Sequence, residues 1–172
     1  MDVFEAIKRR RSCRAFQPDQ LDEKQVAQLL NAAIWAPSAG NVQPWHFYVV
    51  RDSYLKNKLA EAALGQKFIA QAPVAIVVCA DVQRARASYQ ARGAELYCLQ
   101  DTAAACQNML LQATEMGLGS CWVGAFDEKA VGNLLHIVPS HRPVALLCFG
   151  KSAELARKSS RRPLVEVFTE VD

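Results

Sequence analysis

The spacing of apolar residues predicts helices and strands that alternate along the chain. Apolar positions three and four residues apart, from Val26 to Ile34, are typical of one buried face of a helix. Asp22 is a suitable N-cap for this helix, with Gln25 three residues later, and Pro37 ends it because the residue before a proline avoids helical backbone angles. Other helices are expected over residues 3–9, from Asp52 or Ser53 to Leu64, over 95–116 and after Asp127, with a short turn over 67–72.

Four apolar runs predict strands. Residues 74–79 and 144–149 are continuously apolar, which is typical of strands with both faces buried. Residues 46–50 and 121–123 are expected to form two further strands. The alternation of elements favours α/β layering, while strand direction stays open on pattern alone. No Gly-rich turn follows the first strand, so the dinucleotide-binding fingerprint of a Rossmann fold is absent.

Two segments carry more apolar residues than a surface element needs. The helix expected over 95–116 is apolar over most of its circumference, which places it at the centre of the domain. Gly117 suits the position just after its end, with Leu118 as the hydrophobic contact of a Schellman motif. The tail begins charged at about residue 153 and ends with alternating apolar residues from Leu164 to Val171. These side chains need cover, and the sequence leaves open whether their own domain or a second subunit provides it.

Composition narrows the class of protein. The chain has 172 residues, 51% hydrophobic and 22% charged, as expected for one globular domain. No apolar run reaches the roughly 18 residues that cross a bilayer, and no secretion signal is recognisable, so a cytoplasmic protein is expected. The net charge of +3 is too small to imply a polyanionic partner by itself. The six cysteines form no C-x-x-C pair and are interpreted as buried free thiols rather than zinc ligands.

Clusters of arginine and serine lie near both ends of the chain, over residues 9–14 and 157–163. Guanidinium groups beside hydroxyls are donors that a phosphate prefers, so the two clusters are candidates to converge on one phosphate. A solvated helix end and a charged tail are the plainer interpretations. A nucleic-acid patch is a further alternative, although neither cluster is interleaved with the aromatic residues that single-strand binding uses.

Two loops are candidates for binding a ligand. Residues 36–45 combine two prolines and a glycine with Ser, Asn and Gln donors, which suits either a structural connector or the face of a planar polar ligand. Residues 117–124 place glycines around a strand, a pattern that often marks close approach of a ligand to the backbone. Ser120 lacks the flanking glycines of a nucleophile elbow, and Cys121 has no identifiable basic partner. The three histidines show no metal-ligand spacing.

Taken in order, these segments resemble the nitroreductase family of FMN enzymes. The resemblance covers nearly the whole chain. It rests on R-R-S-x-R-x-F from Arg10, on A-P-S-x-x-N-x-Q-P-W-x-F from Ala36, on the glycine segment 117–124 and on R-x-P from Arg161. It implies an α+β fold, an αβα sandwich around a central mixed, largely antiparallel sheet.

The resemblance also implies an assembly and an activity. Residues 1–172 would form a single domain of an interlocked homodimer, with an arm of about residues 153–172 on the partner subunit and FMN at the interface. NADH or NADPH would give a hydride to FMN, and an acceptor such as a nitroaromatic or a quinone would then take the electrons. Because the flavin carries this chemistry, no catalytic acid or base is expected from the protein.

Cofactor-binding residues follow from the resemblance by position. The family often has a lysine at the position of Ser159, for which Lys158 would substitute, and its better-known members often carry a carboxylate where this chain has Val123. The implied contacts are Arg10, Arg11, Ser12, Lys158 and Arg161 at the phosphate and ribityl chain, Arg14 and Gln66 at the pyrimidine edge, Pro37, Ser38 and Asn41 from the other subunit, and Cys121, Trp122, Val123 and Gly124 along the ring.

Two other functions stay open on the sequence. One is a flavin-binding protein of the same fold with another role, such as dehalogenation, flavin breakdown or storage. The other is a basic nucleic-acid-binding module, whose affinity would fall steeply with salt and which would need no cofactor. The favoured partners are a second copy of the chain and a small-molecule acceptor, with no nucleic acid, membrane or metal.

Overall fold

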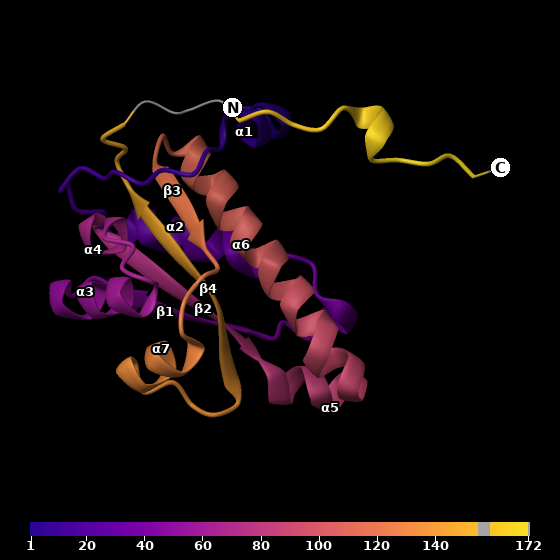
Figure 1. Ribbon diagram of the computed structural model, residues 1–172. Coiled ribbons are helices and arrows are strands. Elements are labelled where there is room, and N and C mark those ends of the chain that lie inside the picture. The colour runs from indigo at the N-terminus through magenta and orange to yellow at the C-terminus, as the bar shows by residue number, and fades with distance from the viewer. Residues whose placement is uncertain (155–158, 172) are drawn as a thin grey trace.

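A four-stranded antiparallel sheet forms the middle layer of the molecule, in a computed structural model that describes residues 1–154 and 159–171 (Figure 1). Its strand order is β1-β2-β4-β3, and a parallel bridge joins Ser12 to Ser120 at the outer edge of β3. The strands are β1 Trp45–Val50, β2 Val74–Asp81, β3 Gly119–Val123 and β4 His141–Gly150. The helices are α1 Val3–Arg9, α2 Glu23–Ile34, α3 Ser53–Ala62, α4 Phe68–Gln71, α5 Val82–Arg92, α6 Cys98–Glu115 and α7 Glu128–Leu134.

Alternating side chains of the central strands enter two separate cores. On β2, Val74, Ile76 and Val78 pack with α2 and α6, whereas the intervening residues pack with α3, α4 and α7. Both faces are therefore covered, which explains the continuous apolar runs in the two central strands. The α+β sandwich expected from the resemblance is confirmed.

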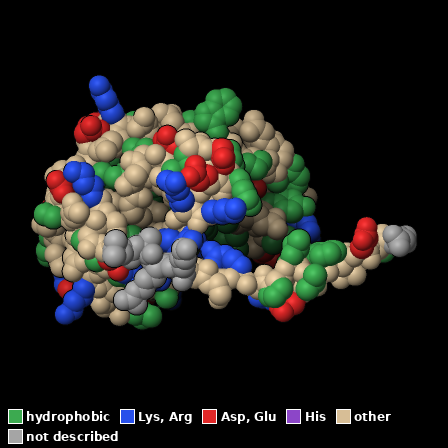
Figure 2. Space-filling model, turned by 90° about the horizontal axis from the view of Figure 1, so that it is seen from above, with side chains coloured by type: hydrophobic (Ala, Val, Ile, Leu, Met, Phe, Trp, Pro, Cys, Tyr) green, Lys and Arg blue, Asp and Glu red, His purple; other side chains and the backbone are tan. Residues whose placement is uncertain are grey.

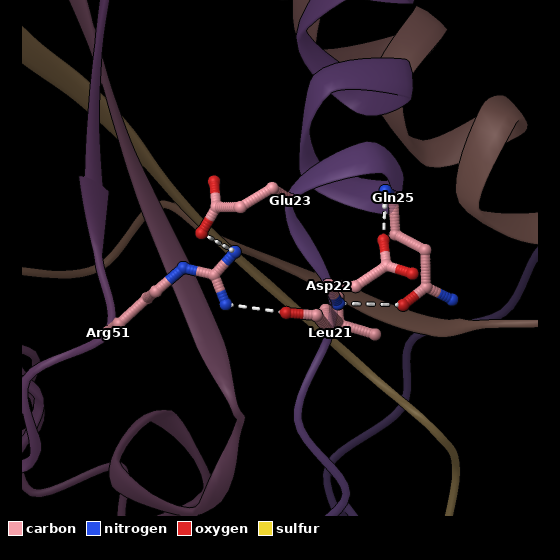
Figure 3. Close-up of polar contacts among 5 residues, drawn as sticks. All are labelled: Leu21, Asp22, Glu23, Gln25 and Arg51. Atoms are coloured by element: carbon pink, nitrogen blue, oxygen red, sulfur yellow. Dashed lines mark hydrogen bonds and ion pairs between the residues drawn. The ribbon is translucent and has the colours of Figure 1, made fainter.

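Local sequence signals fix the ends of α2 and α6. At the start of α2, Asp22 and Gln25 form a capping box, and Arg51 donates to the Leu21 carbonyl at 2.6 Å (Figure 3). At the end of α6, Gly117 has a φ of 72°, and the Leu118 N–H donates to the Ala113 carbonyl at 2.8 Å. The predicted capping box and Schellman ending are both confirmed.

Three features differ from the sequence prediction. The helix expected from residue 95 begins with a π-helical turn, Gly93–Tyr97, before α6 proper. The helix α5 was not predicted, because its sequence VQRARASYQAR has no apolar stripe to mark a buried face. The tail, for which no element was predicted, forms a short 3₁₀ turn, Leu164–Glu166.

The apolar tail lies away from its own domain. It extends past α1 into open space (Figure 1), and its residues 159–171 are exposed. Its own subunit therefore does not supply the cover that these side chains need. Within residues 1–154 and 159–171, no helix has the length and apolar character that crossing a membrane requires.

Candidate functional site

Backbone hydrogen bonds hold the first basic cluster, residues 9–14, against the edge of the sheet. The Cys13 N–H donates to the Ser120 carbonyl at 2.8 Å, which places the segment beside the start of β3. The Ala153 N–H donates to the Ala15 carbonyl at 2.8 Å, which joins the segment to the chain that leaves β4. The two ends of the polypeptide therefore meet at one corner of the molecule.

The glycines around β3 have different roles. A Cβ at Gly119 would lie 2.9 Å from the Cys13 Sγ and 3.3 Å from the Ser152 Cβ, so this glycine lets the N-terminal segment approach closely. Gly117 ends α6 with a left-handed backbone. A Cβ at Gly124 would meet nothing within 4 Å. Gly119 thus gives room to its own chain, and close approach of a ligand to the backbone stays a prediction for this segment.

A pocket of about 600 Å³ opens where the two ends meet. Figure 2 shows Lys and Arg side chains gathered near the point where the C-terminal arm leaves the body. Five of the residues predicted from the sequence line this pocket: Arg10, Arg11, Ser12, Trp122 and Arg161.

Positive charge concentrates in this pocket. The pKa of Arg10 is lowered by burial and then by the like charges of Arg161 and Arg11, so the three guanidinium groups lie near one another. Arg11 donates to the Arg10 carbonyl at 2.7 Å, and Arg161 donates to the Ser159 hydroxyl at 2.8 Å. No carboxylate in the described ranges forms an ion pair with these three arginines. Such a cluster is a ready binding site for an anion with several oxygens.

The alternation of β3 decides which of its side chains reach the pocket. Trp122 is 37% exposed and lines the pocket, whereas Cys121 and Val123 are buried and pack toward α3, α4 and α7. Burial raises the pKa of the Cys121 thiol, and the nearby cations Arg14 and Arg10 oppose this only in part. Cys121 and Val123 can therefore offer backbone groups to a ligand, but not side chains. All six cysteines are buried and free, as predicted.

Arg14 and Gln66 come close to β3 without lining the pocket. The Arg14 backbone N–H donates to the Glu154 carboxylate at 2.6 Å, and the Arg14 side chain is exposed. The Gln66 amide donates to the Ala63 carbonyl at 2.9 Å and to the Ala125 carbonyl at 3.3 Å, so it lies beside the loop that follows β3. Arg14 therefore lies near Cys121 on β3, and Gln66 lies near Ala125, two residues beyond the end of β3.

The loop that contains Pro37, Ser38 and Asn41 is separate from this pocket. None of the three residues lines it. The loop instead packs near the start of α6, where the Ala39 N–H donates to the Asp101 carboxylate at 3.2 Å. Any contact that these residues make with a ligand in such a pocket would have to come from a second copy of the chain.

Sequence reasoning missed five lining residues and named one that cannot be placed. The missed residues are Ile7, Lys8, Gln107, Leu110 and Ser159. The helical spacing of Ile7 with Arg10, and of Gln107 with Leu110, is the signal that could have found those on helices. Lys158, predicted as a phosphate contact, lies outside the described residues.

Comparisons with known proteins agree on one family. The family model described as "Nitroreductase family" matches residues 7–68 and 62–151. The chain is 34% identical to "NADH dehydrogenase" of Thermus thermophilus, over 97% of this chain and 95% of that protein. It is 29% identical to "FMN reductase [NAD(P)H]" of Bacillus subtilis, over 94% of this chain and 70% of that one. The crystal structure of the nitroreductase family protein from Streptococcus pneumoniae TIGR4 covers 99% of this chain and 100% of its own, with a TM-score of 0.89 and 28% identity. The chain belongs to the nitroreductase family.

Proposed function

We propose that this protein is an FMN-dependent oxidoreductase that moves electrons from NADH or NADPH to a small acceptor of the nitroaromatic or quinone class. The observation that carries the proposal is the convergence of Arg10, Arg11 and Arg161, from opposite ends of the chain, on one pocket. The names of the relatives in Bacillus subtilis and Thermus thermophilus support the flavin and the NAD(P)H donor.

The residues of the pocket fit FMN. Three guanidinium groups without carboxylate partners in the described ranges match the charge of its phosphate. The volume of about 600 Å³ lies within the usual range for cofactor sites. Trp122 and Leu110 add apolar surface, and the open space at Gly124 leaves room for a ring to pass the backbone.

Each group of residues then has a role in binding. Arg10, Arg11 and Arg161 bind the phosphate, and Ser12 donates to the ribityl chain. Arg14 and Gln66 hold the pyrimidine edge, where positive charge favours the reduced form of the ring. Residues Cys121 to Gly124 pass along the ring and present backbone groups to it. When bound, FMN supplies the hydride-accepting and electron-donating chemistry.

We expect no acid or base of the protein to take part in the reaction, because FMN carries the chemistry. The described residues that line the pocket include Lys8, but no Asp, Glu, His or Cys. The protein would therefore bind and orient the reacting groups, and bound FMN would supply the transfer of electrons from NAD(P)H to the acceptor.

We also propose that residues 1–172 form a single domain that works as a homodimer. Val3 and Phe4 on α1 and Trp35 after α2 are 72%, 63% and 84% exposed, and the tail side chains are equally uncovered. Apolar surface of this extent marks a protein interface. A second copy would cover it with the arm of about residues 153–172, and would bring Pro37, Ser38 and Asn41 to the flavin of its neighbour.

Purification with and without added FMN tests the cofactor. The protein is expected to be yellow and to lose its long-wavelength absorbance on anaerobic mixing with NADH or NADPH. A protein that stays colourless after incubation with FMN contradicts the proposal. A flavoprotein that neither donor reduces would instead have another flavin role.

The variant Arg10→Ala tests the phosphate site. Loss of a charge-assisted contact of about 1.5–3 kcal/mol weakens FMN binding by roughly 10-fold to 100-fold. Arg86→Ala removes an exposed arginine on α5 that lines no part of the pocket, and it is expected to retain FMN like the wild type. If both variants retain full flavin after dialysis, the phosphate assignment is wrong.

A further inference from the structure

The loop over residues 36–44 has an unfavourable backbone. Gly40, Asn41 and Gln43 all have φ values between 54° and 55°. This left-handed region suits glycine and is tolerated by asparagine, but it is sterically costly for Gln43. A conformation of this kind persists only where the surroundings hold it in place.

Three side chains from α5 and α6 hold this loop. The Asp101 Oδ1 accepts the Ala39 N–H at 3.2 Å, and the Arg84 Nε donates to the Val42 carbonyl at 2.6 Å. The Tyr89 hydroxyl fills the space that a Cβ on Gly40 would occupy. Successive parts of the loop are therefore fixed from outside it.

Asp101 is an unusual residue for the interior. It is 8% exposed, and within residues 1–154 and 159–171 no Lys, Arg or His forms an ion pair with it. Burial raises the pKa of Asp101, and its bond from the Ala39 N–H opposes that rise. Nothing in its place on α6 requires the burial of a charge. In this buried position the carboxylate accepts the hydrogen bond from the loop, that of the Ala39 N–H.

The break at the end of α5 directs Tyr89 toward the loop. The helix loses its regular angles at Tyr89 and Gln90, and a π-helical turn follows. The rings of Tyr89 and Tyr97 meet edge to face with centroids 5.3 Å apart, and Arg92 donates to the Tyr97 hydroxyl at 2.8 Å. Interruptions of this kind are frequent at functional sites.

We propose that Asp101, Arg84 and Tyr89 are positioning residues, which hold loop 36–44 in the conformation in which Ser38 and Asn41 contact the flavin of the partner subunit. This inference rests on the proposed function, because the ligand that the loop contacts is the proposed FMN. None of the three residues touches the reacting atoms, and each acts through the backbone of the loop.

Amide hydrogen exchange of the holoenzyme tests the anchor itself. Asp101→Ala removes the acceptor for the Ala39 N–H, and exchange of the loop amides is expected to rise by about tenfold. Asp101→Asn keeps a carbonyl oxygen in the same place, and its exchange is expected to stay within about twofold of the wild type. Should Asp101→Ala fail to fold, Arg84→Gln removes the second anchor from the surface and is expected to act in the same direction.

Arg51→Ala is the matched control. Arg51 also bonds a backbone carbonyl, that of Leu21, but at the start of α2 (Figure 3). Its loss is expected to lower the melting temperature without raising exchange in loop 36–44. If this variant raises loop exchange as much as Asp101→Ala does, the effect is global instability and the inference is overturned.

The dissociation constant of FMN tests the link to the flavin. It is expected to rise about tenfold in Asp101→Ala and to stay near the wild-type value in Asp101→Asn and Arg51→Ala. Unchanged loop exchange in Asp101→Ala overturns the anchor, and raised exchange with unchanged FMN affinity overturns the role of the loop at the flavin. Failure of the proposed function has a separate sign, which is full flavin retention by Arg10→Ala.

Discussion

Replacing Gly119 with alanine presses a methyl group into the contact that joins the two ends of the chain. The new Cβ would lie 2.9 Å from the Cys13 Sγ and 3.0 Å from the Cys13 Cβ. The thiol can rotate away, but the Cβ is one bond from a backbone that is itself tied to Ser120. The N-terminal segment must therefore move, and overpacking of this kind costs about 1–3 kcal/mol in the free energy of unfolding.

Thermal unfolding of the apoprotein measures this cost. Bound FMN would stabilise the folded state and mask part of the loss, so the flavin is removed first. For a chain of this size, each kcal/mol lowers the melting temperature by about 2–4 °C. Because Ser12 precedes Cys13, we also expect FMN to bind more weakly to Gly119→Ala than to the wild type.

Gly132→Ala is the matched control for Gly119→Ala. Gly132 lies within α7, and a Cβ there would meet nothing within 4 Å. Alanine is the better helix former, so this variant is expected to gain about 0.5–1 kcal/mol in stability. If Gly119→Ala unfolds at the same temperature as the wild type, the close approach at this corner does not constrain the chain and the reasoning fails.

Three further predictions concern the charged groups and the loop. Arg10→Ala is expected to leave the stability of the apoprotein within about 0.5 kcal/mol of the wild type, since it removes a guanidinium that lies beside two like charges; a large loss in an apoprotein melt would contradict this. For Asp101, the folded-state pKa is raised above its ordinary value of 3.8, so the folded state binds the proton more tightly and the stability from this group is lost as pH rises through the folded-state pKa. The free energy of unfolding of Asp101→Asn, relative to that of the wild type, is therefore expected to be higher at pH 7 than at pH 4. Denaturant unfolding at both pH values measures it, and the same difference at pH 4 and pH 7 would refute the assignment. Gly40→Ala combines a left-handed φ of 54° with a collision against the Tyr89 hydroxyl, so the melting temperature is expected to fall, and Tyr89→Ala is expected to recover only part of the loss.

The elements that the sequence predicted well are those with their own local signals. The capping residues Asp22 and Gln25 fix the start of α2, and the apolar runs of β2 and β4 need burial on both faces. In contrast, α5 carries Arg84, Arg86 and Arg92 with few apolar residues, so periodicity could not reveal it. It is Asp81, whose carboxylate accepts the Arg84 N–H at 2.9 Å, that starts this helix.

The site was predictable only as separate pieces. The two basic clusters lie more than a hundred residues apart in the sequence, and nothing in either cluster shows that it meets the other in the fold. Their meeting depends on tertiary contacts, the bonds of Cys13 to Ser120 and of Ala153 to Ala15. Whether Gln107 lines the pocket depends on which face of α6 is turned away from the core, and tertiary packing decides this too.

Two features of the chain support the proposed dimer. The tail carries apolar side chains, such as Val171 at 88% exposure, that its own domain leaves uncovered. The donors of loop 36–44 lie away from the pocket of their own chain, yet three outside residues hold the loop in an unfavourable conformation. In a two-fold dimer, any contact that residue i of one subunit makes with residue j of the other occurs twice, with the subunits exchanged. The proposed dimer therefore covers the tail and completes the pocket in one step, whereas a monomer would leave both the exposed tail and the strained loop unexplained.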